Sequence, residues 1–445
     1  MPSDDISRRD FVGGAAAAGL FTIVPRHVLG GPGYRAPSDT LNVACIGIGG
    51  MGHNDVRGMS IENIYALCDV DWDNGAESFR SFPKAKRYKD YRELFDKEAA
   101  NIDAVTVSTP DHSHAPATLM SLRAGKPTYC QKPLCRTIGE VKRVMEVASQ
   151  SKVATQMGNQ GHSHEGTRQI RELVEAGWIG PVEEVHYWTN RPIWPQGLER
   201  PEEAYNVPPT LDWNLWLGPR PERPYNPAYV PFKWRGWWDF GCGALGDIAP
   251  HAMDAAFWTL GFGYPSHIAV ESTKVYPETA PTLTRLAYDF PAKGKRGPVK
   301  VIWRDGGLEE PRPAGLAPEM EWPWGDPGYQ LWIGRDGMLI ADVYGDSVRL
   351  LDPKKQAEFE HNPPPKKYPR TEGVYKEWIN AIKTGTQPGS NFPGHAGPLT
   401  EMLLLGNLAI RVGQDLDLNV ATGEVTNVKV PDDYLHPTYR DGWTM

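Results

Sequence analysis

Two short segments of the sequence hold residue types that could transfer a proton. Lys132 follows a predicted strand, Thr128–Cys130, and Asp247 and His251 lie four residues apart. Asp247 is expected to cap a helix at its N-terminus, with Pro250 in the first turn, so that Asp247 and His251 share one helix face. A neutral histidine can take the proton of an alcohol while a hydride leaves the carbon, and a nearby ammonium lowers the histidine pKa and stabilises the alkoxide. A capped helix with a buried structural histidine is the alternative interpretation.

The element that must position Lys132 begins with a glycine-rich turn. A buried strand over residues 41–46 runs directly into the pattern G-x-G-x-x-G. Gly47 permits the tight turn, Gly49 lets a pyrophosphate approach the backbone, and Gly52 lets the following helix pack close to the strand. This order of strand, turn and helix predicts a dinucleotide site.

A carboxylate at the end of the second strand of such a unit binds the ribose diol of the adenosine half of the dinucleotide. Asp69 is placed for this role, and Asp71 is the alternative. Neither position is basic and Trp72 follows, so a 2′-phosphate would meet negative charge. We therefore expect the cofactor to be NAD, with NADP as the alternative.

The strand and helix pattern continues through residues 38–158, which we expect to form an NAD-binding Rossmann domain. Its further predicted elements are strands over 63–68, 103–108 and 128–130 and helices over 91–95 and 115–124. The loop Asp111-His112-Ser113-His114 has the composition of a metal-ligand cluster, but two histidines and one carboxylate on such a loop lack supporting hydrogen-bond partners. We expect no metal, and instead a loop at the carboxyl edge of the sheet, where cofactors lie.

From about residue 159 the regular alternation gives way to a second pattern. Predicted helices cover 167–176, 374–382 and 399–412, and predicted strands cover 182–189, 283–290, 299–303 and 338–343. A Trp- and Pro-rich insertion occupies 190–240. Most of its tryptophans are expected to pack as anchors, and one or two to offer flat ring faces to a sugar, with Arg191 or Arg235 contacting hydroxyl groups.

Together, and in this order, these motifs resemble the glucose–fructose oxidoreductase/inositol dehydrogenase (Gfo/Idh/MocA) family over almost the whole chain after the N-terminal segment. The motifs that carry the resemblance are Gly47-x-Gly49-x-x-Gly52, Ser108-Thr109-Pro110-Asp111-His112-x-His114, Lys132-Pro133 and Gly246-Asp247-x-x-x-His251-x-x-Asp254. The resemblance implies a catalytic triad of Lys132, Asp247 and His251. One departure is that the family usually has Glu before the Lys-Pro pair, whereas this sequence has Gln131.

The resemblance also implies an α/β fold in which residues 159–445 form an α+β domain with a large, open, mostly antiparallel sheet. That sheet would close the active site and hold copies of the chain together as a homo-oligomer, a dimer or a tetramer. The residues then expected to contact the cofactor are Gly47, Gly49, Gly50, Met51, Gly52, Asp69, Thr109, Pro110, His114, Gln131 and Lys132. Those expected to contact a carbohydrate substrate are Asn159, His162, Arg235, Trp237, Asp247 and His251.

Composition and the N-terminus limit the classes of function. The chain has 445 residues, a formal net charge of −8 and no cluster of basic residues, which excludes a nucleic-acid binder. Its five cysteines form no disulfide framework, and Cys45 and Cys68 are expected in the core. Arg8 and Arg9 precede a weakly apolar stretch over residues 11–24, which is too short to span a bilayer.

Residues 1–37 are therefore identified as a twin-arginine signal and linker. Such a signal exports a folded protein, so we expect a periplasmic location without stable membrane insertion, with the signal either removed or retained. The periplasm has no free nicotinamide pool. NAD is accordingly expected to leave the cytoplasm tightly bound to the protein.

The leading expectation is an NAD-dependent oxidoreductase that acts on a secondary alcohol of a sugar, glycoside or cyclitol. A first alternative is an NAD-dependent glycosidase or lyase, which oxidises a hydroxyl transiently, eliminates the aglycone and adds water. That chemistry needs a further base, for which Tyr187, His162 or His164 are the candidates. A second alternative is a non-catalytic sugar or dinucleotide sensor, against which the presence of all three triad residues argues.

Overall fold

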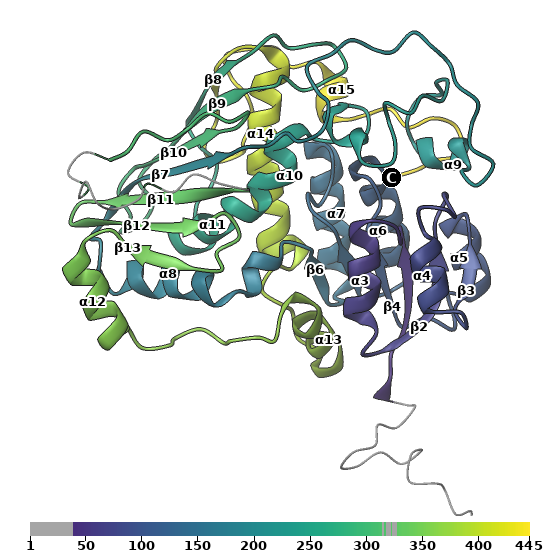
Figure 1. Ribbon diagram of the computed structural model, residues 1–445, viewed down its shortest axis with the longest axis horizontal. Helices are drawn as coiled ribbons and strands as arrows, with labels where there is room; N and C mark the ends of the chain where they lie inside the picture. The colour runs from purple at the N-terminus through teal and green to yellow at the C-terminus, as the bar shows by residue number, and fades with distance from the viewer. Residues whose placement is uncertain (1–38, 314–315, 317–321, 323–326) are drawn as a thin grey trace, which may run out of the picture.

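The computed structural model describes residues 39–313, 316, 322 and 327–445. The predicted twin-arginine signal lies outside the described residues. Two sheets lie beside each other, with a long helix, α14 (Gly397–Val412), between them (Figure 1). None of the helices in the described ranges is long and apolar enough to cross a membrane.

The first sheet is parallel and has six strands in the order β3-β2-β1-β4-β5-β6. The strands are β1 (Asn42–Ile46), β2 (Asn63–Cys68), β3 (Lys86–Tyr88), β4 (Ala104–Val107), β5 (Thr128–Cys130) and β6 (Thr155–Met157). The connecting helices are α3 (Met51–Met59), α4 (Ala76–Ser81), α5 (Tyr91–Glu98), α6 (His114–Arg123) and α7 (Ile138–Ser151). Because helices cover both faces, β1 and β4 are continuous apolar runs that are almost wholly buried. The predicted Rossmann fold is confirmed.

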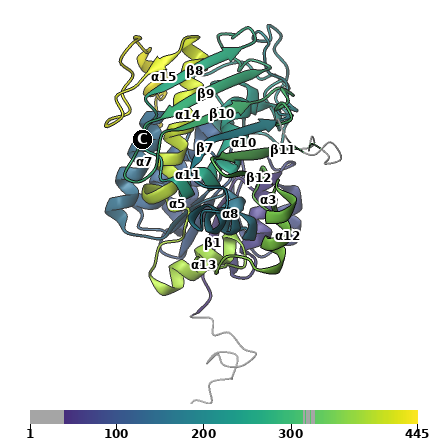
Figure 2. The same cartoon turned by 90° about the vertical axis from the view of Figure 1, so that its left-hand side faces the viewer.

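The second sheet has eight strands in the order β13-β12-β11-β7-β10-β9-β8-β14. The strands are β7 (Val182–Thr189), β8 (His267–Ser272), β9 (Thr284–Phe290), β10 (Val299–Arg304), β11 (Gly328–Gly334), β12 (Gly337–Asp342), β13 (Val348–Leu350) and β14 (Leu416–Asp417). All neighbouring pairs are antiparallel except β7 with β10. This confirms the predicted large, mostly antiparallel sheet, which faces the viewer in Figure 2.

Helices cover one face of the second sheet and link it to the first. They are α8 (Glu165–Glu175), α10 (Gly243–Ala252), α11 (Asp254–Leu260) and α14. α14 is buried along nearly its whole length and packs against α7, α10 and β8. Each fully buried leucine of such a helix contributes about 1.5–3 kcal/mol through the apolar surface it removes from water. α14 therefore fixes α10 relative to the Rossmann helices.

Toward its C-terminus, the chain returns to pack against the first sheet. α13 (Val374–Thr384) follows α12 (Pro353–His361) and packs beside α3 and β6. Trp378 of α13 is fully buried in one apolar cluster with Val43 and Tyr129, and its Nε1 donates a hydrogen bond to the carbonyl oxygen of Ala154. Residues after 374 thus complete the core of the N-terminal layer.

The buried cysteines agree with the sequence analysis. Cys45 and Cys68 lie in the core of the parallel sheet, and all five cysteines are buried free thiols within the described part of the chain. Most tryptophans of the 190–240 insertion pack in a separate aromatic cluster that surrounds the short helix α9 (Trp213–Leu217).

Candidate active site

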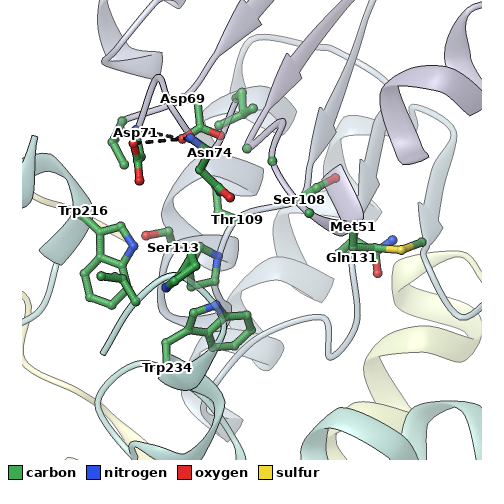
Figure 3. Close-up of a pocket in the computed structure, with 18 of the residues that line it drawn as sticks. Met51, Asp69, Asp71, Asn74, Ser108, Thr109, Ser113, Gln131, Trp216 and Trp234 are labelled. Carbon is green, nitrogen blue, oxygen red and sulfur yellow. Dashed lines mark hydrogen bonds between the residues drawn. The ribbon is translucent and has the colours of Figure 1, made fainter. Parts of the chain in front are cut away.

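A cavity of about 460 Å³ lies at the carboxyl edge of the parallel sheet. Its walls come from the turn after β1, the ends of β2, β4 and β5, the insertion at residues 190–240, and α10. In Figure 3, Trp216 and Trp234 of the insertion lie across the cavity from Asp69 and Asn74. This is the crevice in which ligands of open α/β sheets bind.

The glycine-rich turn has glycines where its backbone conformation or its packing excludes a Cβ. Gly47 and Gly50 have φ angles of 76° and 54°, which residues with a Cβ rarely adopt. A Cβ on Gly49 would lie 2.1 Å from the side-chain nitrogen of Asn74, and one on Gly52 would lie 2.2 Å from the Gly47 carbonyl oxygen. The following helix, α3, has no side-chain cap among the described residues, and the amides of Gly52 and His53 donate to the carbonyl oxygens of Gly49 and Gly50. The N-terminus of such a helix favours the negative charge of a phosphate. The turn fits a dinucleotide.

Asp69 and Asp71 both line the adenosine end of this cavity. The carboxylate of Asp69 joins the turn after β1 to the loop after β2. Its two oxygens accept hydrogen bonds from the backbone N–H groups of Ile48 (2.8 Å) and Asp71 (2.9 Å). Burial raises the pKa of Asp69 to about 6. Asp71 is more exposed than Asp69, so the ribose could be contacted by either carboxylate.

Gln131 is held between a buried carboxyl group and the backbone of Lys132. Its Nε2 lies 3.0 Å from each carboxylate oxygen of Asp55, and its Oε1 accepts a hydrogen bond of 3.2 Å from the N–H of Lys132. Asp55 also accepts hydrogen bonds from Ser108 and Tyr375, and burial raises its pKa to about 6. A glutamate at position 131 would place a second carboxylate against Asp55. The amide therefore suits this site.

Lys132, Arg235 and Asp247 meet at the other end of the cavity. Oδ1 of Asp247 accepts hydrogen bonds from Nζ of Lys132 (2.9 Å) and Nε of Arg235 (3.0 Å). Nζ of Lys132 also donates to the backbone carbonyl of Asp247, at 2.9 Å. Burial alone would raise the pKa of Asp247, but the charges of Lys132 and Arg235 outweigh burial and lower it well below its ordinary value. Asp247 is therefore a fixed anion with two cationic partners.

The prediction that Asp247 caps its helix is wrong. α10 begins at Gly243 with Cys242 as its N-cap, and the Cys242 carbonyl accepts a hydrogen bond from Nδ2 of Asn407 on α14. Packing against α14 thus fixes the start of the helix, rather than a capping side chain. Pro250 lies inside the helix and has no N–H to donate to the carbonyl of Gly246.

His251 lies one turn after Asp247, buried at 5% exposure, and it does not belong to the cavity lining itself. Its Nδ1 is buried without a hydrogen-bond partner among the described residues, and its ring packs edge-on against Tyr344 at 4.9 Å. Burial, and then the charge of Lys132, lower the pKa of His251 to about 3. The ring is therefore neutral at physiological pH.

Asp111 adds a second carboxyl group to this end of the cavity. It is 3% exposed, and burial together with the negative charge of Asp247 raises its pKa to about 7, against the opposing charges of Lys132 and Arg235. Sequence reasoning placed Asp111 in a loop at the carboxyl edge of the sheet and gave it no contact with the cofactor or the substrate. In the structure it is a titratable acid beside the charged cluster.

Ser113 of the 111–114 loop also lines the cavity, whereas the two histidines point elsewhere. The ring nitrogens of His114 lie 2.8 Å from the carbonyl oxygens of Pro133 and Thr109, which joins two loops of the sheet. Nε2 of His112 lies 2.8 Å from the carbonyl oxygen of Trp216. These histidines tie the sheet edge together, and neither lines the cavity.

Buried hydrogen-bond donors surround Asp254, which is the first residue of α11. Oδ1 of this carboxylate accepts hydrogen bonds from Nδ2 of Asn159 (2.7 Å) and Nε2 of His395 (2.6 Å), and Nδ1 of His162 lies 3.0 Å from Oδ2. The ligand atoms of His162, Asp254 and His395 lie within 4.8 Å of one another, which a metal ion could also exploit. Here protein donors already surround the carboxylate, so the group acts as a hydrogen-bonded anchor.

The structure divides the predicted site residues into two sets. Those that line the cavity are Gly47, Gly49, Gly50, Met51, Asp69, Thr109, Pro110, Gln131, Lys132, Arg235 and Asp247. Those outside its lining are Gly52, His114, Asn159, His162, Trp237 and His251. Trp237 is 1% exposed in the aromatic cluster of the insertion, and its Nε1 donates to the carbonyl oxygen of Ala228.

Three further residues were considered for the pocket. Tyr187 is fully buried between the second sheet and its helices, without a hydrogen-bond partner for its hydroxyl among the described residues, and burial raises its pKa well above the ordinary value. His164 lies near the surface and pairs with Asp346 at 2.6 Å. Arg191 donates to the side chain of its neighbour Asn190. None of the three lines the cavity.

Sequence reasoning missed several residues that do line it. They include Asn54 and Asn74, Lys89 to Tyr91, Leu215 and Trp216, Phe232 and Trp234, and Trp443. The guanidinium of Arg235 lies over the rings of Phe232 (4.4 Å) and Trp234 (4.3 Å). The excess of tryptophan in the insertion was a signal for such a wall, but it could not tell Trp234 from Trp237.

Two family models match the sequence. The oxidoreductase family's NAD-binding Rossmann fold (GFO_IDH_MocA) matches residues 41–159, and that family's C-terminal alpha/beta domain matches residues 166–296. Together these ranges cover more than half of the chain. The chain belongs to the Gfo/Idh/MocA oxidoreductase family. In this Gfo/Idh/MocA protein, residues 41–159 form the NAD-binding domain.

Curated relatives of this family member match part of its length. An inositol 2-dehydrogenase from Serratia proteamaculans is 32% identical over 147 residues, which is 32% of this chain and 43% of that relative. A myo-inositol 2-dehydrogenase from Thermotoga maritima is 28% identical over 143 residues, 32% of this chain and 42% of the relative. The chain thus matches about half or less of the length of these relatives.

Solved structures share the fold over a larger part of the chain. The WlbA dehydrogenase from Bordetella pertussis, in complex with NADH and UDP-GlcNAcA, has a TM-score of 0.58 and 14% identity and covers 85% of this chain and 99% of its own. A levoglucosan dehydrogenase in complex with NADH and levoglucosan has a TM-score of 0.57 and 18% identity, with coverage of 85% and 99%. At these identities the likeness concerns the fold alone.

Proposed function

We propose that this protein transfers a hydride between NAD and a secondary alcohol of a sugar, glycoside or cyclitol. The observation that carries the proposal is the cluster of Lys132, Arg235 and Asp247 at one end of a cavity whose other end holds the glycine-rich turn. Such a cluster can orient a hydroxyl group and stabilise the charge that develops on its oxygen. The named substrates of the relatives and structural neighbours support the carbohydrate class.

The proposed mechanism divides the work among four side chains. Bound NAD supplies the hydride acceptor. Lys132 donates to the substrate oxygen as it becomes an alkoxide, while Asp247, held by Lys132 and Arg235, accepts a hydrogen bond from a neighbouring hydroxyl. In this proposal neutral His251, which lies one turn from Asp247 and outside the lining of the unliganded cavity, takes the proton when the substrate is bound. The negative charges of Asp247 and Asp254 favour the imidazolium that then forms.

The aromatic wall of the cavity, formed by Phe232 and Trp234, supports the proposal of a carbohydrate substrate. Trp234 and Phe232 line the cavity, and the guanidinium of Arg235, which belongs to the charged cluster, lies over both rings. Flat rings suit the C–H faces of a sugar, and a guanidinium offers several donors to its hydroxyl groups. The wall therefore combines the two kinds of contact that a polyol ring needs.

The first prediction concerns His251. Replacing it with Ala removes the proton acceptor, so turnover should fall by roughly 10²–10⁴-fold on a responsive polyol. Nucleotide content should stay unchanged, because His251 lies outside the cavity lining. His267→Ala is the matched control, since His267 lies at the far edge of the second sheet. Near-normal turnover of His251→Ala on a confirmed substrate would remove the ring from the reaction.

A second candidate function is redox-neutral cleavage of a glycoside, and Asp111 favours it. After oxidation of a ring hydroxyl, the neighbouring C–H becomes acidic, and a base must remove that proton as the aglycone leaves. Asp111 is a carboxyl group with a pKa of about 7 beside the charged cluster, unlike the remote Tyr187. Release of free aglycone without net formation of NADH would favour cleavage, and stoichiometric NADH would favour the dehydrogenase.

We also propose two properties of the whole protein. Copies of the chain would associate through the outer face of the eight-stranded sheet, which is broad and turned away from the cavity (Figure 2). The Arg8-Arg9 pair would direct the folded, NAD-loaded protein to the periplasm. Family membership supports the first of these, and the pattern of the N-terminal sequence supports the second.

A further inference from the structure

The segment 436–445 crosses the adenosine end of the cavity. It leaves the short helix α15 (Asp432–Leu435) and runs between the Rossmann domain and the insertion (Figure 1). In the figure its end, marked C, lies near α9. The segment is far in sequence from every other part of the cavity wall.

The segment binds the Rossmann domain through aromatic and polar contacts. The ring of Trp443 packs edge-on against Tyr91 with 6.1 Å between centroids, and the guanidinium of Arg92 lies 4.3 Å from the Trp443 ring centroid. Arg92 also donates to the carbonyl oxygen of Gly442 at 3.1 Å. The hydroxyl of Tyr439 donates to the carboxylate of Glu140 on α7 at 2.8 Å. These contacts hold the segment to α5 and α7.

On the side of the insertion, Arg440 holds the segment. Nε of Arg440 donates to the carbonyl oxygen of Gly218 at 2.6 Å, and its terminal nitrogens donate to the side-chain and backbone oxygens of Asn214 at 2.6 and 2.5 Å. Its backbone N–H donates to the carbonyl oxygen of Pro219 at 3.1 Å. Arg440 therefore fastens the segment to α9, which supplies Leu215 and Trp216 to the cavity wall.

Trp443 itself lines the cavity, beside Lys89, Asp90 and Tyr91. These residues follow β3, on the side of the sheet away from Lys132, because the strand order places β3 beyond β2. Asp69 at the end of β2 marks the position of the adenosine ribose. The base beyond that ribose would then lie against the wall that Trp443 and Tyr91 form.

We propose that residues 436–445 are a strap that encloses the adenosine half of the bound dinucleotide, with Trp443 as an adenine-binding residue. Release of the cofactor then requires Arg440 to leave Gly218 and Asn214, so the strap sets the dissociation rate. The proposal rests on dinucleotide binding in this cavity, and not on the reaction or on the substrate. It gives a physical cause for tight retention of NAD.

The test measures NAD dissociation from the full chain, without any substrate. Protein loaded with NADH is mixed with excess NAD, and the loss of bound NADH fluorescence gives the dissociation rate. Stacking of a base on an aromatic ring is commonly worth a 10- to 100-fold change in affinity, so Trp443→Ala should accelerate release by about that factor. Trp443→Phe should recover most of the difference, and Arg440→Ala should accelerate release without removing a side chain that lines the cavity.

Trp178→Ala is the matched control. Trp178 is also a partly buried tryptophan, but it packs against Phe359 of α12, away from the cavity. A release rate for Trp443→Ala equal to that of the wild type, or an equal acceleration in Trp178→Ala, would overturn the strap. Wild-type protein that binds no NADH would overturn both the strap and the proposed NAD-dependent function, whereas normal release with no dehydrogenase activity would overturn the function alone. Thermal unfolding of each variant shows that it is folded.

Discussion

Charge balance decides how the individual residues of the cavity behave. Two cations, Lys132 and Arg235, face two carboxyl groups, and the two carboxyl groups respond in opposite ways. Asp247 bonds directly to both cations and stays ionised. Asp111 bonds directly to neither cation, so burial dominates and raises its pKa to about 7. Only one of the two acids is therefore charged below neutrality.

The second prediction follows from this difference. Below pH 7 Asp111 is neutral, and above pH 7 it adds a negative charge beside Asp247. The plot of log kcat/KM against pH should therefore bend near 7 in the wild type. Asp111→Asn mimics the neutral acid, so it should match the wild type at pH 5.5 and differ above pH 8, by roughly tenfold if the charge is worth about 1.4 kcal/mol. Superimposable profiles would show that Asp111 takes no part.

Some residue roles could be predicted from the sequence and others could not. Gly47, Asp69 and Lys132 stand at fixed places relative to apolar strands, so their spacing predicts the cofactor cavity. The pairing of Gln131 with Asp55 depends on which face of α3 turns toward β5, which no local pattern indicates. Trp443 was missed because it reaches the cavity only through packing between distant segments.

At the scale of elements, the junction of α10 and α11 lies directly after the helix that carries Asp247 and His251. Asp254 begins α11 and lies three residues after His251. Its carboxylate joins this junction to the turn Gln160–Ser163 and, through His395, to the turn Phe392–Ala396 before α14. Burial would raise the pKa of Asp254, but the charges of His162 and His395 outweigh burial and lower it well below its ordinary value.

The third prediction is that Asp254→Ala destabilises the protein. Removing a buried, paired charge leaves its donors unsatisfied, so the free energy of unfolding should fall by about 3 kcal/mol, measured by chemical denaturation. Because the folded-state pKa of Asp254 is lowered, its contribution is present above pH 4 and is lost as the pH falls further. The variant should therefore lose less stability than the wild type on acidification. Asp289→Asn, at a partly exposed position on β9, is the control, and an equal effect there would contradict the anchor.

The elements themselves were predicted where burial and propensity agree. Strands β9, β10 and β12 lie within one residue of the predicted ranges, because each is rich in apolar and β-branched or aromatic residues. The strands β3, β6, β13 and β14 were missed, since two or three residues become a strand only by pairing with a neighbour. The longer strands β8 and β11 were missed as well. The start of α10 was misplaced because Asn407, far along the chain, fixes it.

On the scale of the whole molecule, the cavity is assembled from segments that are far apart in sequence. The Rossmann strands supply its floor, the insertion at residues 190–240 and α10 supply one wall, and residues 436–445 close its adenosine end. α13 and α14, which follow most strands of the second sheet in sequence, pack against the N-terminal layer. A complete cavity therefore exists only after the entire chain has folded.

This assembly leads to the last prediction, which concerns export. If NAD enters only a folded chain, a route that carries folded proteins is the one that delivers a loaded enzyme to a compartment without free nicotinamide. Changing Arg8 and Arg9 to Lys should leave active, NAD-containing protein in the cytoplasm, whereas the matched changes Arg26→Lys and Arg35→Lys should not. Cell fractionation, with nucleotide content measured in each fraction, provides the test. Export of Trp443→Ala should continue, but with less NAD in the periplasmic protein, because its cofactor dissociates faster. Equal periplasmic amounts of wild type and the twin-lysine variant would show that Arg8 and Arg9 do not direct export.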